Sequence, residues 1–482
     1  MIDLRPVGYV IGLLVAMLGL TMLLPMLVDI VAGDEHWSVF LECAILTFLT
    51  GGFVALSCQT SKGKGLTIQQ TFLLTTGVWL TLPLFGALPF LLGETEARFV
   101  DAFFEAMSGL TTTGSTVFSG LEELPRGILL WRGMLQWLGG IGIIVVAMVF
   151  LPELRVGGMQ IFRSEGFDTF GKILPRATEI SSRISVIYIA MTMICALAYL
   201  LTGMNGFDAT VHAMTTIATG GFANYDASFG AFGAGTEYVA VVFMLLAALP
   251  FVRFVQLTSG TAQPLFQDSQ IRAFLVTAIG VVGVIWAWQF FVMGVQTEAG
   301  IRKAMFNGVS ILTGTGYAST DYMLWGSFPV AVLFFTGLIG GCAGSTACSI
   351  KVFRYQLLFA SIRVQLAKVQ QPRGVFTPRY QGRRVDEDVL NSVMSFFVFF
   401  TVTLGVLAVL LGMTGLDFTT ALSGAAAALA NIGPGLGDTI GPAGNFASLN
   451  DTAKWLLSAG MLIGRLELLA VYAILTTQFW RA

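Results

Sequence analysis

The sequence predicts an all-α polytopic membrane protein built from four similar units, each a span, a re-entrant loop and a second span, plus two extra N-terminal spans. Of the 482 residues, 55% are hydrophobic and 11% are charged, whereas soluble domains carry about 25% charged residues. Several apolar stretches exceed the roughly 18 residues that mark a membrane-spanning candidate. A short apolar segment followed by a tract of small residues also recurs four times, and such repeats define an architecture. Together these observations exclude a soluble protein.

The first two spans lie outside the repeats. They are expected at about 7–32 and 37–58, joined by the acidic loop 33–36. The first apolar run is too long for the h-region of a cleavable signal and lacks a small-residue cleavage site, so it is predicted to be a span. Five cysteines have neither metal-ligand spacing nor a disulfide framework and are expected to be small core residues: Cys43, Cys58, Cys195, Cys342 and Cys348.

Each repeat contains one apolar segment of about ten residues. Such a segment is too short to cross an apolar layer of about 30 Å, so it is expected to enter and leave the membrane on the same side. The four segments are predicted at about 99–110, 207–217, 301–312 and 417–429. Their alignment places His212 at the position of Glu105, and Ala304 and Ala421 at the position of Ala102 and Ala209.

Longer spans flank each short segment, which gives ten spans in all. The spans of the repeats are expected at about 66–92 and 127–151, 184–203 and 237–257, 271–294 and 328–350, and 389–412 and 454–478. The corresponding units are residues 1–65 for the two extra spans, then 66–155, 156–262, 263–370 and 371–482 for the four repeats.

A tract of four mostly small residues follows each short segment: Thr111, Thr112, Thr113 and Gly114; Ala218, Thr219, Gly220 and Gly221; Thr313, Gly314, Thr315 and Gly316; Ala430, Asn431, Ile432 and Gly433. The last glycine of each tract can adopt backbone angles closed to other residues, so successive carbonyls can point the same way. Four such strands around a central pore would stack rings of oxygens, the arrangement that replaces the hydration shell of K⁺. The C-terminal ends of the short helices would add partial negative charge at the centre. Glycines that only pack helices together are the alternative, but they do not explain four copies at matching offsets.

The distribution of Lys and Arg predicts the orientation of the chain. With both termini in the cytoplasm, nineteen of these residues fall on the cytoplasmic side and five on the opposite side. All four short segments then enter from outside. Acidic residues on their flanks are expected to form a vestibule that concentrates cations: Glu94, Glu96, Asp101, Glu105, Glu122, Glu123, Asp208, Asp226 and Asp321.

Two predicted spans carry unusual residues. The run Gly340, Gly341, Cys342, Ala343, Gly344, Ser345 and Thr346 contains three glycines, and each costs a helix interior roughly 1 kcal/mol relative to alanine. These glycines either break the helix or pack it closely against a neighbour. Arg465 lies in the middle of the last span, where a charge marks a functional candidate, although a structural salt bridge is also open. Glu467 points off a different face of that helix, and Arg132, near the outer end of its span, is expected to snorkel.

The four tracts resemble those of TrkH/TrkG-type potassium uptake proteins, in the superfamily that also holds KtrB and the plant HKT transporters. The motifs that carry the resemblance are residues 111–115, 218–222, 313–317 and 431–435, and the resemblance extends over essentially the whole chain. As in that family, each tract departs from the channel-type TVGYG and keeps mainly one shared glycine, so selectivity should be less strict than in a fourfold K⁺ channel. The resemblance further implies that the glycine-rich run is a gating loop under the filter and that Arg465 faces the pore there.

The predicted function is K⁺ uptake across the plasma (inner) membrane through a channel-like, K⁺-selective pore, with Rb⁺ as a surrogate ion. The resemblance implies a homodimer and a cytosolic ring of nucleotide-binding RCK/KTN-type subunits, for which the basic segment 351–384 would be the docking surface. The chain has no Gly-x-Gly-x-x-Gly on a soluble βαβ unit, so any nucleotide is expected on the partner and no cofactor in this chain, only K⁺ in the filter. No nucleic-acid partner is expected.

Two other function classes are alternatives to a K⁺-selective pore. A Na⁺- or H⁺-coupled secondary carrier is the main alternative, because carriers use broken helices at the membrane midplane, but they usually show two related halves rather than four quarters. An enzyme is not expected, because His36 and His212 offer no His-x-x-x-His or similar pairing.

Overall fold

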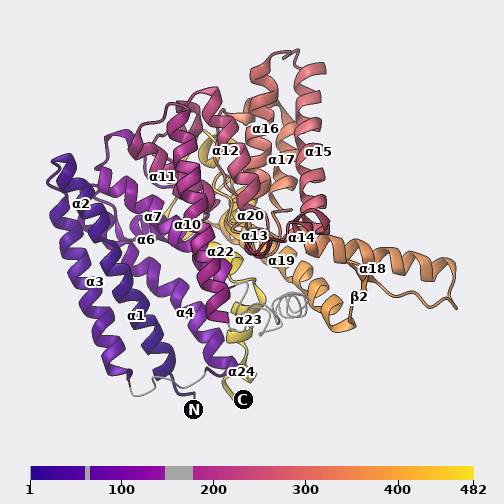
Figure 1. Ribbon diagram of the computed structural model, residues 1–482, viewed down its shortest axis with the longest axis horizontal. Coiled ribbons are helices and arrows are strands. Elements are labelled where there is room, and N and C mark those ends of the chain that lie inside the picture. Colours follow the sequence, from indigo (N-terminus) through magenta and orange to yellow (C-terminus); the bar gives the residue numbers. More distant parts are fainter. Residues whose placement is uncertain (1, 60–65, 147–176, 482) are drawn as a thin grey trace.

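The computed structural model describes residues 2–59, 66–146 and 177–481, and these are mainly helical (Figure 1). Both termini lie at the same end of the molecule. Within the described residues, seven helices are long and apolar enough to cross a membrane, or up to nine when two bent helix pairs are counted as spans. A short antiparallel hairpin, β1 (Arg379–Tyr380) with β2 (Arg383–Arg384), follows the projecting helix α18. The predicted helical, polytopic membrane fold is confirmed.

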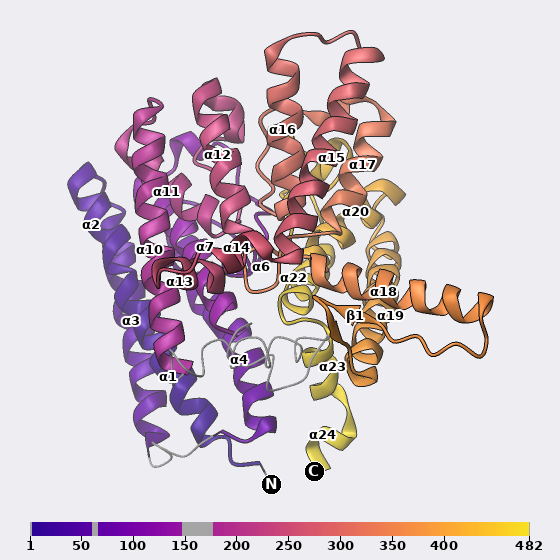
Figure 2. The ribbon, with the colours of Figure 1, turned by 45° about the vertical axis from the view of Figure 1, so that its right-hand side comes forward.

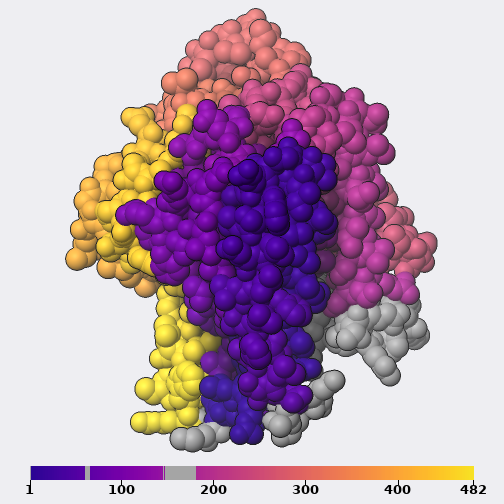
Figure 3. All heavy atoms as spheres, turned by 90° about the vertical axis from the view of Figure 1, so that its left-hand side faces the viewer, coloured from indigo at the N-terminus to yellow at the C-terminus, as the bar shows by residue number. Residues whose placement is uncertain are grey.

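The two extra N-terminal spans form a tight helical hairpin on one face of the molecule (Figure 3). The first span is α1 (Arg5–Thr21) continued by α2 (Leu23–Ala32), and the second is α3 (Trp37–Ser57). Small residues bring the backbones together: a Cβ added to Gly51 would lie 2.4 Å from the Ala16 nitrogen. Close backbone approach at small residues is a main source of helix association in lipid.

In repeats 1 and 2 a short helix lies between longer ones. Repeat 1 contains α4 (Ile68–Gly86), α5 (Leu88–Leu92), the short helix α6 (Phe99–Leu110) and α7 (Arg126–Val145). Repeat 2 contains α10 (Ala177–Leu201), the short helix α11 (Gly206–Ile217), α12 (Ala234–Ala247) and α13 (Phe251–Thr258). The end of the span expected at about 127–151 lies outside the described residues.

Repeats 3 and 4 follow the same plan. Repeat 3 contains α14 (Gln263–Gln267), α15 (Ser269–Phe291), the short helix α16 (Glu298–Thr313), α17 (Ser327–Gly337) and α18 (Val352–Gln370). Repeat 4 contains α19 (Glu387–Met413), the short helix α20 (Phe418–Ala430), α22 (Asp451–Arg465), α23 (Leu469–Leu475) and α24 (Thr477–Arg481). A helical turn follows each tract: η2 (Leu121–Glu123), η4 (Ser228–Ala231), η5 (Tyr322–Trp325) and α21 (Gly437–Ile440).

Two spans that were predicted as continuous are broken, and so is the span that carries the glycine-rich run. The span expected at about 237–257 bends by 90° between α12 and α13, where Pro250 disfavours helical angles at the preceding residue. The span expected at about 454–478 bends by 110° between α22 and α23, where Glu467 and Leu468 have positive φ. The span expected at about 328–350 is helical only as far as Gly337, so the predicted helix-breaking effect of the glycine-rich run is confirmed.

The helices of the four repeats pack side by side (Figure 2), and the contacts of the short helices place the repeats in a closed ring. Each packs against longer helices of its own repeat and against the second long helix of the preceding repeat: α11 contacts α7, α16 contacts α12, and α20 contacts α17. The ring closes because α6 of repeat 1 contacts α22 of repeat 4. This cyclic order brings the C-terminal ends of all four short helices, and the tracts that follow them, to one place.

Candidate ion filter and the loop beside it

The tracts share an unusual backbone conformation. At the second position of each tract, φ is positive: 52° at Thr112, 50° at Thr219, 74° at Gly314 and 51° at Asn431. At the fourth position, φ is 87° at Gly114, 83° at Gly221 and 81° at Gly316. A left-handed residue at every second position turns successive carbonyls toward one side, which ordinary strands do not do.

The expectation for the fourth tract glycine is wrong. Gly433 has no positive φ, unlike its three counterparts. Pro434 follows it, and a proline restricts the preceding residue to extended angles. Conversely, the left-handed conformation of Thr112 and Thr219 is not apparent from the sequence, because threonine disfavours it.

The four tracts touch one another in cyclic order through their backbones. A Cβ added to Gly114 would lie 2.2 Å from the Gly220 carbonyl oxygen, and one added to Gly221 would lie 1.9 Å from the Thr315 oxygen. A Cβ on Gly316 would lie 2.7 Å from the Gly433 nitrogen, and one on Gly433 would lie 3.1 Å from the Gly114 oxygen. No side chain fits at the first three of these contacts without moving a neighbouring tract.

Side chains link the tracts to each other and to α7. Asn431 Nδ2 donates to Thr113 Oγ1 at 3.0 Å, and Ser115 Oγ donates to the Gly433 carbonyl at 2.7 Å, which joins repeats 1 and 4. Gln136 of α7 donates to the Gly220 carbonyl at 2.6 Å and accepts from the Phe222 N–H at 3.0 Å. The Gly220 oxygen therefore already has a protein donor. Gln136 is not among the residues that the sequence predicts for the site.

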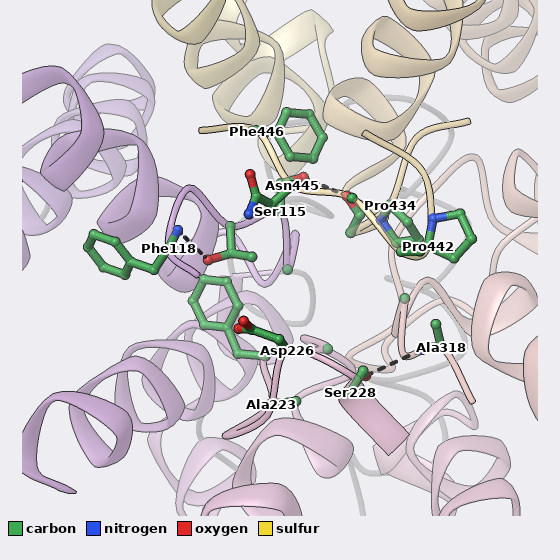
Figure 4. Close-up of a pocket in the computed structure, with 18 of the residues that line it drawn as sticks. Ser115, Phe118, Ala223, Asp226, Ser228, Ala318, Pro434, Pro442, Asn445 and Phe446 are labelled. Atoms are coloured by element: carbon green, nitrogen blue, oxygen red, sulfur yellow. Dashed lines mark hydrogen bonds between the residues drawn. The ribbon is translucent and has the colours of Figure 1, made fainter. Parts of the chain in front are cut away.

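A cavity of about 160 Å³ lies next to the tract glycines (Figure 4). Its lining includes Gly114, Gly221, Gly316 and Gly433, so all four repeats contribute. Asp226 and Arg132 are the charged residues of the described lining. The Asp226 carboxylate accepts the Gly120 N–H at 2.7 Å and the Leu121 N–H at 3.2 Å.

The predicted acidic vestibule is only partly present. Glu105 and Asp208 are buried and bonded inside the protein, so they do not line it. Asp208 accepts hydrogen bonds from Asn224 Nδ2 at 2.7 Å and from the Tyr225 hydroxyl at 2.8 Å. The bond to this carboxylate raises the pKa of Tyr225 to about 12, because it stabilises the protonated phenol.

Arg132 does not snorkel. It is 1% exposed, and its Nε lies 2.8 Å from Glu105 Oε1. Its Nη1 donates to the Ala223 carbonyl at 2.8 Å, and its guanidinium stacks on the Phe222 ring. The buried carboxylate of Glu105 keeps the arginine inside, since a paired charge need not reach water.

The cavity is lined by the last glycines of the tracts, whereas the loop between α17 and α18, residues 338–351, contacts second tract positions. Its contacts with the tracts are made by Cys348, whose Sγ lies 3.6 Å from Thr112 Oγ1. A Cβ on Gly314 would lie 3.6 Å from the Cys348 nitrogen. Cys348 was expected to be a small core residue, and its place against two tracts gave no sequence signal.

The loop is held more firmly than its glycine content predicts. The Cys342 N–H donates to the Ala248 carbonyl at 3.0 Å, and Thr346 Oγ1 donates to the Ala247 carbonyl at 3.0 Å. The Gly344 carbonyl accepts from the Phe251 N–H at 2.9 Å. The loop thus forms hydrogen bonds with the backbone groups at the break between α12 and α13. The break in repeat 3 and the break in repeat 2 therefore provide hydrogen-bond partners for each other.

Arg465 is buried and reaches the same loop. Its Nη1 donates to Cys348 Sγ, and its Nη2 donates to the Gly139 carbonyl at 3.3 Å. Its Nε has no hydrogen-bond partner among the described residues. No carboxylate pairs with Arg465 in the described part of the chain, which argues against the purely structural salt bridge.

Glu467 instead joins two helix breaks. Its carboxylate pairs with Arg354 Nη2 and lies 3.7 Å from Lys351 Nζ, and all three residues are buried. Arg354 also lies over the Phe396 ring. The ion cluster connects the start of α18 to the turn between α22 and α23. Intramembrane charges are functional candidates by default, so Arg354 and Glu467 could have been singled out from the sequence.

The fold and the site together define a polytopic membrane protein whose four short helices end at one shared site. The chain belongs to the TrkH family of cation transport proteins, whose family model matches residues 36–478. It is 42% identical to the Trk system potassium uptake protein TrkI of Halomonas elongata, over 99% of this chain and 97% of the relative. It is 36% identical to TrkH of Escherichia coli K12, over 99% of both chains. The structure is also similar to the crystal structure of the potassium transporter TrkH from Vibrio parahaemolyticus. The match covers 100% of both chains, with a TM-score of 0.92 and 34% sequence identity.

The ion cluster gives a stability prediction. Glu467→Gln removes the carboxylate charge that pairs with Arg354 and Lys351, and breaking a buried pair costs about 3–5 kcal/mol. The melting temperature in detergent and the yield of monodisperse protein should both fall. Asp451→Asn is the control, because it removes an exposed partner of Arg98 and surface pairs contribute little. A Glu467→Gln protein as stable as wild type would show that the cluster does not hold the two breaks together.

Proposed function

We propose that this protein takes up K⁺ across the cell membrane through a channel-like pore in which the four tracts are the selectivity filter. The observation that carries the proposal is the cyclic backbone contact among Gly114, Gly221, Gly316 and Gly433. Backbone oxygens held at contact distance around one axis can replace the water of a dehydrated cation. The relatives named above are described as potassium uptake or transport proteins, which favours K⁺ over other cations.

The electrostatics of the short helices favour a cation at the tracts. The C-terminal end of a helix carries a partial negative charge, and α6, α11, α16 and α20 all direct this end to the tracts. The four tracts differ in sequence, and Gly433 differs in conformation. Such approximate symmetry supports a filter that prefers K⁺ less strictly than a fourfold channel does.

The gate in this proposal is the loop 338–351. It lies against the tracts through Cys348, and Arg465 adds a buried positive charge at the same place. A cation that leaves the filter meets both. Movement of the loop would open this path, and α18, which begins at the end of the loop, is the element through which a partner could move it.

The surrounding assembly is also a proposal. We place both termini and α18 in the cytoplasm of a cell with the protein in its inner membrane, and we expect a homodimer that binds a cytosolic nucleotide-binding ring. The docking segment proposed from the sequence begins too early, because Lys351 and Arg354 are buried in the ion cluster. The exposed basic residues of this region are Arg363, Lys368, Arg373, Arg379, Arg383 and Arg384.

A Na⁺- or H⁺-coupled carrier is the competing function. The three broken spans of repeats 2, 3 and 4 favour it, because carriers bind their ions at broken helices. The two functions differ in their dependence on a gradient. Rb⁺ flux into liposomes that is independent of an imposed proton or Na⁺ gradient supports the channel-like pore, and obligatory coupling supports the carrier.

The filter assignment predicts the effect of one substitution. Gly316→Ser places a Cβ 2.7 Å from the Gly433 nitrogen at a φ of 81°, which must shift the neighbouring tract. The K⁺ over Na⁺ preference in competitive Rb⁺ uptake should fall about tenfold, equivalent to about 1.4 kcal/mol.

Gly326→Ser is the matched control for this measurement. Gly326 belongs to the same repeat and has a φ of 92°, but nothing lies within 4 Å of an added Cβ. It reproduces the backbone strain without the clash and should leave the preference unchanged. An unchanged preference in a correctly inserted Gly316→Ser protein would contradict the filter assignment.

The gate assignment predicts a gain of function. Deletion of residues 343–347 removes the bonds that hold the loop to Ala247, Phe251 and Gln270, and basal Rb⁺ flux per molecule should rise severalfold. Thr346→Val removes one of these bonds and should give a smaller increase. A deletion protein that inserts normally but conducts no better than wild type would place the gate elsewhere.

A further inference from the structure

Each tract is followed by an exit segment, defined as the five residues after its last residue: 115–119, 222–226, 317–321 and 434–438. All four exit segments are tied to the short helix of their own repeat at the same place. The backbone N–H three residues after the tract donates to a polar side chain on that helix in every case. The donors are Val117, Asn224, Ser319 and Leu436, and the acceptors, named here the anchor residues, are Glu105, His212, Asn307 and Ser423.

In repeat 1 the anchor is a charged pair. Glu105 Oε2 accepts from the Val117 N–H at 2.9 Å, and Oε1 accepts from the Thr116 hydroxyl at 2.9 Å. Arg132 balances the carboxylate and also donates to the Ala223 carbonyl in the exit segment of repeat 2. One ion pair therefore holds two neighbouring exit segments.

In repeat 2 the anchor is a neutral imidazole. His212 Nδ1 lies 2.8 Å from the Asp208 carbonyl, which can only accept, so the proton is on Nδ1. Nε2 is then free to accept from the Asn224 N–H at 3.4 Å. The ring also packs against Phe229 and Phe232, with centroids 5.5 Å and 5.0 Å away.

Repeats 3 and 4 make the same tie with smaller groups. Asn307 Oδ1 accepts from the Ser319 N–H at 3.2 Å, and its Nδ2 donates to Ser319 Oγ at 3.0 Å. In repeat 4 the aligned residue is Gly424, which has no side chain. The adjacent Ser423 takes its place and accepts from the Leu436 N–H at 2.9 Å.

We propose that the anchor residues are positioning residues that set the K⁺ over Na⁺ preference of the pore. The inference rests on the proposed filter function. Each tract is fixed on one side by the end of its short helix and on the other by its anchor, so the anchor determines where the last tract glycine and its carbonyl lie. Oxygen positions in turn decide which ion is coordinated. Four different side chains thus hold the backbone at the same position of each exit segment.

Helix packing alone does not account for these side chains. Glu105, His212 and Asn307 are completely buried, and Ser423 is nearly so. A buried polar group is unfavourable unless it is hydrogen-bonded, and apolar residues of similar shape would pack these positions at less cost. The polar atoms accept hydrogen bonds from the exit segments, in each of which a buried backbone N–H would otherwise have no partner.

The test compares two substitutions of His212 in the full-length protein reconstituted into liposomes. His212→Phe keeps a ring among the neighbouring aromatic side chains and removes the acceptor. His212→Gln keeps an acceptor at the place of Nε2. The readout is the ratio of K⁺ to Na⁺ in competition with Rb⁺ uptake, which a simple loss of folded protein does not change. The ratio should fall about twofold to tenfold in His212→Phe, the effect of one lost hydrogen bond, and recover in His212→Gln.

A second position and two controls complete the experiment. Asn307→Leu should lower the ratio in the same way, which keeps the test decisive if His212→Phe does not fold. Asp417→Ala removes the carboxylate that caps α20 by accepting the Thr420 N–H, a bond outside the exit segments, and should reduce stability without changing the ratio. An unchanged ratio in both anchor variants, beside a lowered ratio in Gly316→Ser, would overturn this proposal and leave the filter standing. An unchanged ratio in Gly316→Ser as well would overturn both.

Discussion

Backbone contact among the four tracts is the constraint on which the rest of the structure depends. Added Cβ atoms on Gly114 and Gly221 would come within 2.2 Å of carbonyl oxygens of the next repeat. Such proximity requires four short helices to end at one level, and hence the cyclic packing in which α6 contacts α22 and closes the ring. It also requires the segment after each tract to leave the site in a fixed direction. The anchor residues and the Glu105–Arg132 pair supply that restraint from behind the tracts.

The broken spans follow from a second requirement, because backbone groups within a membrane must find partners inside the protein. The chain meets it by placing the breaks against one another. The end of α12 offers the carbonyls of Ala247 and Ala248 to the loop of repeat 3. The turn after α22 places Glu467 against Arg354 at the start of α18. Several hydrogen bonds thus hold the loop of repeat 3 in a defined position.

Much of this architecture could be predicted from the sequence. The short segment predicted at about 99–110 is α6 (Phe99–Leu110), and the glycine-rich run does end a helix. Hydropathy and repeat spacing are local signals, which is why they succeeded. The bend at Glu467 and the burial of Arg132 depend on partners distant in the sequence, Arg354 for the first and Glu105 for the second, whereas the bend at Pro250 has a local signal in the proline itself. The conformation of Gly433 could have been read from Pro434, whereas the left-handed Thr112 and Thr219 are imposed by the tertiary contacts.

The central claim is that a dehydrated cation lies among the four tracts. Anomalous diffraction from crystals of the protein soaked in Rb⁺ tests it most directly. We expect a Rb⁺ peak on the axis between the tracts, at the level of Gly114, Gly221, Gly316 and Gly433, which disappears when Na⁺ replaces Rb⁺. Rb⁺ found only in the outer cavity beside Asp226, with none among the tracts, would contradict it.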